Sequence, residues 1–387
     1  MMRVVTALDS FKGSLSSIEA GLAVSEGFKK ADPNTVVEVR PLADGGEGTV
    51  EALTTGMNGE LVEALVTGPL GAPVKCIYGI IWDTMTAVIE MSGAAGITLI
   101  SRNELNPLDA TTYGVGEVIR DAIRRGCKRF IVGIGGSATN DGGVGMLQAL
   151  GYDFLDECGN QIPLGAKGLK ELKVINDEGV VPELKECSFL VACDVTNPLC
   201  GPNGCSAVYG PQKGATPSMI AEMDAWLSHY AAKSKAEYPK ADPEHPGTGA
   251  AGGLGFAFLT YTNATLKPGI EIVLAETRLE EYIKAADVVV TGEGSLDMQT
   301  SMGKAPIGVA KLAKKYGKTV IAFAGGVAED ATECNKNGID AFFPIVRGIT
   351  TYEEAMNKEN AKKNLSAAAE QVMRLLMVTE RATGNDA

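Results

Sequence analysis

The strongest constraint on the fold is a repeated order of short β-branched run, glycine-containing polar loop and helical stretch. Residues 3–8 (RVVTAL) and 36–40 (VVEVR) have the composition of strands, and helical stretches follow at 17–30 and 49–55. Strands that alternate with helices form parallel sheets, whose ligands bind in the loops after the strands. The 47 glycines cluster in short loops without a fixed period, which excludes a collagen-like or low-complexity chain.

The same order returns in the last third of the chain. Residues 287–291 (DVVVT), 319–324 (TVIAFA) and 341–346 (AFFPIV) are predicted strands, and residues 306–316 are a predicted helix. We expect these strands to share one parallel sheet with the strands at the N-terminus.

The expected fold class is α/β with two α/β domains. We predict a Rossmann- or flavodoxin-like parallel-sheet domain of residues 1–60 and 261–387, with a second α/β domain, residues 61–260, inserted into it. Apolar runs at 129–134 (RFIVGI) and 187–193 (CSFLVAC) give the inserted domain strands of its own.

Charge and composition exclude several classes of partner. Lys and Arg number 35 against 48 Asp and Glu, a net charge of −13, so nucleic acid and anionic membrane surfaces are not expected partners. The apolar region 80–100 is broken by Asp83 and Glu90 and does not predict a membrane span. The N-terminal apolar run is too short for a signal peptide. Eight cysteines without a C-x-x-C pair fit a reducing cytoplasm better than a metal or disulfide site, and the oligomeric state is left open.

A glycine-rich loop at 133–143 (GIGGSATNDGG) is the best phosphate-binding candidate. No Walker A motif is present, and the G-x-G-x-x-G at 247–252 follows no strand. The 133–143 loop instead follows a predicted strand and precedes a helix at 144–150, so its amides could hold a phosphate. The alternative is a tight turn in which Asn140 or Asp141 only caps the helix.

Four further loops place carboxylates, and in one case a lysine, at strand ends. Each alone could be a solvated turn, but together they suggest Mg²⁺ bound through carboxylate oxygens, as phosphoryl transfer requires. The loops contain Asp9 and Lys12, Asp44 and Glu47, Asp194 and Asn197, and Glu293 and Asp297.

Smaller anion-binding candidates lie outside these loops. Thr111 and Thr112 open a predicted helix and offer amides and hydroxyls to a carboxylate. Arg102 and Arg347 are further candidates, each with a surface ion pair as the equal alternative.

Several long segments together resemble the bacterial glycerate kinase family, the type unrelated to actin-like sugar kinases. They run almost from end to end of the chain: 9–17 (DSFKGSLSS), 41–49 (PLADGGEGT), 106–117 (NPLDATTYGVGE), 133–151 (GIGGSATNDGGVGMLQALG), 192–204 (ACDVTNPLCGPNG), 208–215 (VYGPQKGA), 246–258 (PGTGAAGGLGFAF) and 291–306 (TGEGSLDMQTSMGKAP). The resemblance implies ATP-dependent phosphorylation of D-glycerate with Mg²⁺, in a cleft between the two domains. It favours 2-phosphoglycerate as product, although the residues do not choose between the C2 and C3 hydroxyls.

Within that resemblance each candidate residue receives a hypothetical role. Asp194 is the expected general base, and Lys12 is expected to hold the transferring phosphate or the glycerate carboxylate. The expected Mg²⁺ ligands are Asp44, Glu293 and Asp297. The expected nucleotide contacts are Gly135, Gly136, Ser137, Asn140 and Asp141. The expected glycerate contacts are Asp9, Thr111, Thr112, Asn197 and Arg347.

Two other classes of function fit the sequence less well. Residues 133–138 also match G-x-G-x-x-A of an NAD-dependent dehydrogenase, with Asp153 and Asp156 near the interval expected for the ribose carboxylate. The Asn-Asp pair inside that loop, however, would oppose a pyrophosphate. A non-catalytic small-molecule binding protein would not need so many carboxylate loops.

Overall fold

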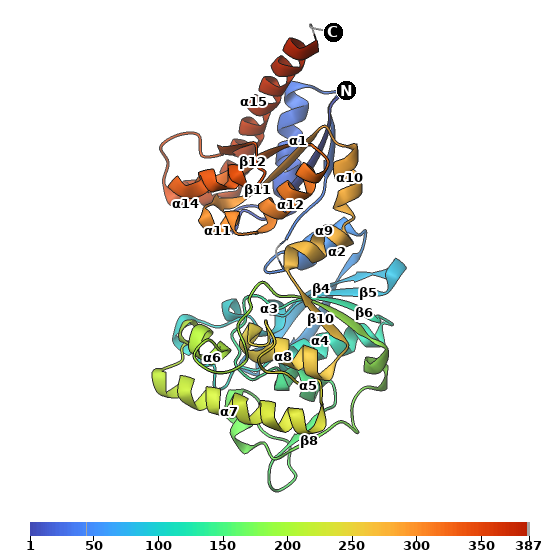
Figure 1. Cartoon of the computed structure of the whole chain (residues 1–387), viewed down its shortest axis with the longest axis vertical. Helices are drawn as coiled ribbons and strands as arrows, with labels where there is room; N and C mark the ends of the chain where they lie inside the picture. Colours follow the sequence, from blue (N-terminus) through green and yellow to red (C-terminus); the bar gives the residue numbers. More distant parts are fainter. Residues whose placement is uncertain (44, 385–387) are drawn as a thin grey trace. The chain divides into compact units, whose positions relative to one another are not determined.

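The computed structural model describes residues 1–43 and 45–384, with the side chains of residues 380–384 left aside (Figure 1). Contacts divide the chain into unit 1, residues 1–44, 55–57 and 270–387, and unit 2, residues 45–54 and 58–269. Unit 2 is thus inserted into unit 1, with its main boundaries at 44/45 and 269/270. The boundaries expected from the sequence were 60/61 and 260/261.

Unit 1 is built on a five-stranded sheet in which every neighbouring pair is parallel, as the strand and helix alternation predicted. Its strand order is β13-β12-β11-β1-β2. The strands are β1 (Arg3–Leu8), β2 (Val36–Val39), β11 (Val288–Leu296), β12 (Thr319–Val327) and β13 (Ala341–Pro344). The N-terminal and C-terminal thirds of the chain therefore do share one sheet.

Helices pack around this sheet, and the long C-terminal helix α15 lies along α1 (Figure 1). Their buried core includes Val4, Phe28, Phe323 and Leu365. The helices of unit 1 are α1 (Ser17–Ala31), α10 (Leu279–Ala285), α11 (Met298–Ser301), α12 (Ala305–Lys315), α13 (Glu333–Lys336), α14 (Tyr352–Met356) and α15 (Lys358–Gly384). Two more, α2 (Thr49–Gly56) and α9 (Gly269–Glu276), cross the boundaries between units.

One strand of unit 1 is longer than the sequence predicted. β11 was expected to end at residue 291 and to be followed by a loop, but it continues to Leu296, and Glu293 pairs with Ala324 of β12. Glycine explains the difference, because a Cβ on Gly292 would overlap the backbone carbonyl of Phe323. Glu293 therefore projects from a strand rather than from a loop.

Unit 2 is built on a six-stranded mixed sheet in the order β10-β9-β6-β5-β4-β3. The β3-β4-β5 part is antiparallel, and β5, β6, β9 and β10 are parallel. The strands are β3 (Glu60–Thr67), β4 (Pro73–Ile81), β5 (Thr86–Glu90), β6 (Arg129–Gly133), β9 (Ser188–Ala192) and β10 (Ala264–Lys267). A separate antiparallel pair joins β7 (Asp153–Leu155) to β8 (Val174–Asn176).

The helices of unit 2 include one that begins directly after the glycine-rich loop. They are α3 (Ser92–Ala95), α4 (Tyr113–Arg124), α5 (Val144–Ala149), α6 (Cys205–Tyr209), α7 (Pro217–Glu237) and α8 (Ala250–Tyr261). No helix in the described part of the chain combines the length and apolar character that a membrane span requires.

The four parallel strands of unit 2 end in one row across the sheet. Glu90 of β5 pairs with Gly133 of β6, Gly133 pairs with Ala192 of β9, and Ala192 pairs with Lys267 of β10. The loops that follow these residues therefore leave the sheet at the same edge, where open α/β sheets bind ligands.

Candidate functional site

A cavity of about 480 Å³ lies at the carboxyl ends of the unit 1 strands β1, β11, β12 and β13. One part of its wall is apolar and includes Phe11, Ile345 and Met356. Another part carries charge, from Lys12 and Lys304 and from Glu293 and Asp297. The remaining lining residues are Ser10, Ser14, Gly294, Ser295, Gly325, Gly326, Val346, Tyr352, Ala355, Ala361 and Asn364. Lys12, Glu293 and Asp297, predicted from two separate segments, thus line the same cavity.

The two carboxylates of this cavity are linked through Thr300. The Thr300 hydroxyl donates to Glu293 Oε1 at 2.6 Å, and the Thr300 backbone N–H donates to Asp297 Oδ1 at 2.9 Å. Asp297 is the N-cap of α11, and the hydrogen bond from the Thr300 backbone lowers the pKa of its carboxyl group. Asp297 is therefore ionised at neutral pH and can offer oxygen to a cation.

The glycine-rich loop of unit 2 follows β6 as predicted, but most of it is buried. Within residues 133–143, all of which the structure describes, only Gly135 and Gly136 are exposed. Ser137 is 8% exposed and Asn140 is 0% exposed. Only the Gly135–Gly136 turn can therefore meet a ligand directly without rearrangement.

Asp141 at the end of this loop is bonded to the protein itself. Its carboxylate accepts the Thr112 backbone N–H at 2.8 Å, the Thr112 hydroxyl at 2.9 Å and the Gly143 backbone N–H at 3.1 Å. Longer hydrogen bonds come from Thr111 and Gly145. Burial raises the pKa of this carboxyl group, while these donors oppose the shift.

These contacts change the interpretation of three predicted ligand contacts. The Thr111 and Thr112 hydroxyls, expected to receive an anion, donate to Asp141, and both side chains are buried. Asp141 also occupies the start of α5, which was expected to receive a phosphate. The geometry supports the capping alternative for Asp141 and a structural role for both threonines.

A lysine that the sequence did not single out for a role lies beneath the same loop. Lys213 is 2% exposed, and its Nζ donates to Ser137 Oγ at 2.8 Å and to the Thr139 carbonyl at 2.6 Å. Burial lowers its pKa to about 8. No local motif marks this position, because the contact joins segments more than 70 residues apart. The single sequence signal was its place in the family-like segment 208–215.

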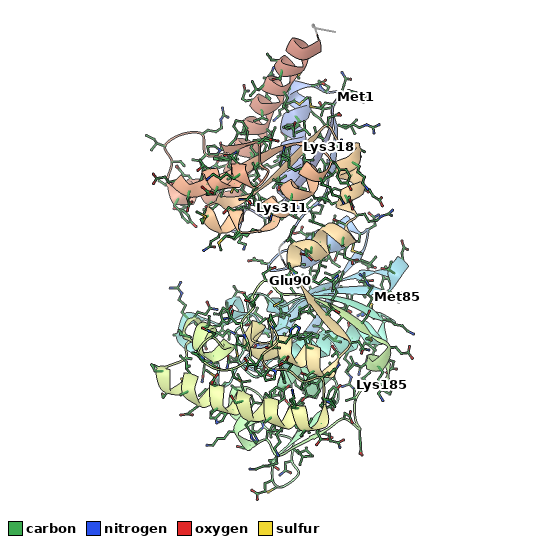
Figure 2. All side chains as sticks on the ribbon, viewed as in Figure 1. Met1, Met85, Glu90, Lys185, Lys311 and Lys318 are labelled. Atoms are coloured by element: carbon green, nitrogen blue, oxygen red, sulfur yellow. The ribbon has the colours of Figure 1, made fainter. Side chains whose placement is uncertain are left out.

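Carboxylates gather at the row of strand ends in unit 2. Glu90 (Figure 2) accepts the Val50 backbone N–H at 2.7 Å, and burial raises its pKa to about 7, with a further contribution from the charge of Glu47. The segment after Asp44 passes close to these ends, because a Cβ on Gly133 would overlap the Gly45 carbonyl. Glu90 was not predicted as a site residue, since one glutamate at the end of a strand carries no motif.

Asp194 follows β9 at the same edge of the sheet. Its Oδ1 accepts the backbone N–H of Gly269 at 3.0 Å, which orients the carboxylate at the end of β10. The predicted metal ligand Asp44 lies outside the described residues. Among the residues that are described, no three or more His, Cys, Asp or Glu side chains are grouped to hold a metal ion.

Three other predicted glycerate contacts lie in different settings. Asn197 donates to the Asn203 carbonyl and accepts the Tyr209 hydroxyl at 2.6 Å, so it orders its own loop. Asp9 is 4% exposed and accepts the Ser10 backbone N–H. Arg347 is exposed after β13 and is not among the residues that line the unit 1 cavity.

Comparison with known proteins decides the family. The sequence profile of the glycerate kinase family matches residues 4–377. The chain belongs to the glycerate kinase family. This family membership makes it a phosphotransferase with an alcohol acceptor and confirms the resemblance noted from its segments; the dehydrogenase alternative is not supported.

Individual family members are similar over nearly their whole length. The glycerate kinase of Bacillus subtilis (strain 168) is 46% identical over 371 residues, 96% of this chain and 97% of its own. The glycerate 2-kinase of Escherichia coli (strain K12) is 45% identical over 383 residues, 99% of this chain and 100% of its own. The crystal structure of a proposed glycerate kinase 2 from Salmonella typhimurium LT2 is 44% identical, has a TM-score of 0.90 and covers 98% of this chain and 99% of that one. The α/β fold predicted for this family member is thereby confirmed.

Proposed function

We propose that this protein transfers the γ-phosphoryl group of ATP to the 2-hydroxyl of D-glycerate, giving 2-phosphoglycerate and ADP. The observation that carries the proposal is the family match over residues 4–377. The similarity to the E. coli glycerate 2-kinase over 99% of the chain favours the 2-hydroxyl over the 3-hydroxyl.

The unit 1 cavity is the proposed nucleotide site. Its volume of about 480 Å³ suits a nucleotide-sized ligand, since small-molecule sites span roughly 300–1,000 Å³. The apolar wall formed by Phe11, Ile345 and Met356 would contact the base, and Lys12 and Lys304 would hold phosphate oxygens. Ser137, Asn140 and Asp141 are buried in the other unit, so we do not assign them to the nucleotide.

Glu293 and Asp297 are the proposed protein ligands of Mg²⁺. Mg²⁺ in phosphoryl-transfer sites is held by one or two carboxylates together with substrate phosphates and water, so two carboxylates in one cavity fit this ion. Bound there, the ion would neutralise charge on the phosphate oxygens of ATP.

The row of strand ends in unit 2 is the proposed glycerate site. The exposed Gly135–Gly136 turn would receive the carboxylate of glycerate through its backbone amides. Asp194, oriented by Gly269, would accept the proton of the reacting hydroxyl as that hydroxyl attacks the γ-phosphorus.

Replacement of Asp194 tests this assignment. Asp194→Asn should lower kcat by about a hundredfold or more while leaving the circular dichroism spectrum unchanged. Asp156→Asn, in a surface turn of the same unit, is the matched control and should retain full activity. A loss of less than about tenfold in Asp194→Asn would show that Asp194 is not the base.

Coupled ATP consumption with and without D-glycerate tests the activity itself. ³¹P and ¹H NMR of the product should place the phosphate on C2. Phosphate on C3 would overturn the proposed position, and no glycerate-dependent consumption would overturn the proposed substrate.

We further propose a cytoplasmic location and no nucleic-acid partner. Eight free cysteine thiols are consistent with a reducing compartment, and the net charge of −13 disfavours polyanions.

A further inference from the structure

Lys213 places an ammonium group in the interior of unit 2 without an ion-pair partner. It ends the short 3₁₀ helix η6 (Pro211–Lys213), and its acceptors are the Ser137 hydroxyl and the Thr139 carbonyl. Among the described residues no carboxylate lies within ion-pair distance of its Nζ. The charge of Asp141 favours the ammonium without a direct ion pair, but burial outweighs it, because the pKa of Lys213 is lowered. A buried charge that no ion pair compensates costs several kcal/mol in general, and stability alone does not explain its presence.

The position of this charge relates it to the exposed part of the glycine-rich loop. Ser137, one acceptor of Lys213, directly follows the Gly135–Gly136 turn. Gly136 has φ +73°, a conformation that favours glycine and turns the chain sharply before Ser137. The Lys213 ammonium is therefore bonded to the residue that directly follows the exposed Gly135–Gly136 turn. Its electric field adds to that of the backbone amides of this turn, and both favour a bound anion.

Other contacts hold the remainder of the loop in place. A Cβ on Gly252 would overlap the Thr139 carbonyl, and the Gly142 backbone N–H donates to the Gly252 carbonyl at 2.9 Å. In addition, Asn140 Nδ2 donates to Ser206 Oγ, on α6, at 2.8 Å. Contacts with α6 and α8 thus fix the loop, and Lys213 fixes the part next to the exposed turn.

We propose that Lys213 is a positioning residue for the carboxylate of glycerate. It orders the 135–137 turn through its two hydrogen bonds and supplies, from beneath, the positive charge that balances the bound anion. This inference rests on the assignment of glycerate to the glycine-rich loop in the proposed function.

Lys213→Met removes the charge and keeps an unbranched side chain that is one heavy atom shorter. We expect the KM for D-glycerate to rise by about tenfold or more, and the KM for ATP to stay within about twofold of the wild type. Ser137→Ala removes one hydrogen bond and keeps the charge, and should raise the KM for glycerate less. The control is Lys240→Met, since Lys240 also donates to a backbone carbonyl, that of Thr262, but lies away from the loop.

The pH dependence separates a charge effect from a packing effect. Because the pKa of Lys213 is lowered to about 8, the wild-type KM for glycerate should rise as the pH passes through about 8. The titratable groups that face Lys213 are Asp141, ahead of α5, and Cys205 on α6, whose pKa burial raises to about 12. Lys213→Met should lack the rise near pH 8, whereas Ser137→Ala should retain it.

The outcomes distinguish this inference from the proposed function. An unchanged KM for glycerate in Lys213→Met, in an enzyme whose wild type phosphorylates glycerate, overturns the role of Lys213 alone. A raised KM for ATP with an unchanged KM for glycerate also overturns the role of Lys213, because the loop would then hold the nucleotide. Circular dichroism shows whether Lys213→Met folds. If it does not, the KM of Ser137→Ala for glycerate and the wild-type pH profile test the role of Lys213 instead.

Discussion

The carboxylate of Asp141 accepts both the backbone N–H and the hydroxyl of Thr112, at 2.8 and 2.9 Å. Thr112 precedes α4 and Asp141 precedes α5. The Thr112 hydroxyl oxygen also accepts the backbone N–H of Met146, in α5, at 2.9 Å. One buried carboxylate therefore ties together the starts of two helices that precede and follow β6 in the chain and pack against each other.

Asp141→Ala should destabilise unit 2 markedly. The change leaves the buried N–H groups of Thr112, Gly143 and Gly145 without an acceptor, and each such group costs about 1–3 kcal/mol in general, so we expect a loss of at least about 3 kcal/mol. Both tryptophans, Trp82 and Trp226, lie in unit 2, so tryptophan fluorescence in urea reports its unfolding. Asp156→Ala, at a surface turn, is the control and should lose about 1 kcal/mol or less.

The sequence predicted those parts of the fold that local composition controls. Strands such as β1 and β12 are β-branched runs, and the parallel order follows from their alternation with helices. The extension of β11 through Glu293 was not predicted, because the glycine of a loop and the glycine of a closely packed strand have the same sequence signature.

The residues of the candidate site differ in the same way, because some have a local sequence signal and others do not. Lys12, Glu293 and Asp297 could be predicted, because charged residues near glycines at strand ends mark a ligand edge. Lys213 and Glu90 could not, since their importance depends on burial against distant segments, which one sequence does not reveal. Thr112 and Asp141 were assigned to a ligand because a cap and an anion site use the same residue types.

Filling the unit 1 cavity should impair nucleotide binding alone. Ala355 on α14 lines the cavity, so Ala355→Trp is expected to raise the KM for ATP by about tenfold or more without changing the KM for glycerate. Glu353→Trp, at an exposed position of the same helix that does not line the cavity, is the matched control. Binding of a fluorescent ATP analogue measures the effect directly, and unchanged affinity in Ala355→Trp would place the nucleotide elsewhere.

Glu293→Gln should weaken the response to Mg²⁺. The amide keeps the shape of the side chain and its acceptor for Thr300 but removes the negative charge, so half-maximal activity should require about tenfold more Mg²⁺. Glu329→Gln, outside the cavity lining, is the control. An identical Mg²⁺ titration in both variants contradicts the assignment of Glu293 as a ligand.

Glu90 should make the stability of unit 2 depend on pH. Its pKa is about 7 in the folded state against an ordinary value of 4.5, so the folded protein holds a proton that the unfolded chain releases. The stabilising effect of that proton is complete below pH 4.5 and is lost as the pH rises toward 7. Glu90→Gln titrates no proton there, so its stability relative to the wild type should improve by on the order of 2–3 kcal/mol from pH 4.5 to 8. Urea unfolding at several pH values measures this, and parallel pH profiles for the two proteins would contradict it.

Ala251 carries a local backbone cost that glycine should remove. It has φ +52°, followed by Gly252 at +67° and Gly253 at +95°, so three successive residues in α8 are left-handed and only the first has a Cβ. That conformation costs a non-glycine residue roughly 1–2 kcal/mol, whereas glycine adds about 0.5–1 kcal/mol of backbone entropy loss on folding. Ala251→Gly should therefore leave the free energy of unfolding unchanged or raise it by up to about 1 kcal/mol. Ala232→Gly, at an exposed position of α7, should lower it by about 0.5–1 kcal/mol. Tryptophan fluorescence in urea compares the two, and equal losses in both variants would show that the turn at Ala251 carries no strain.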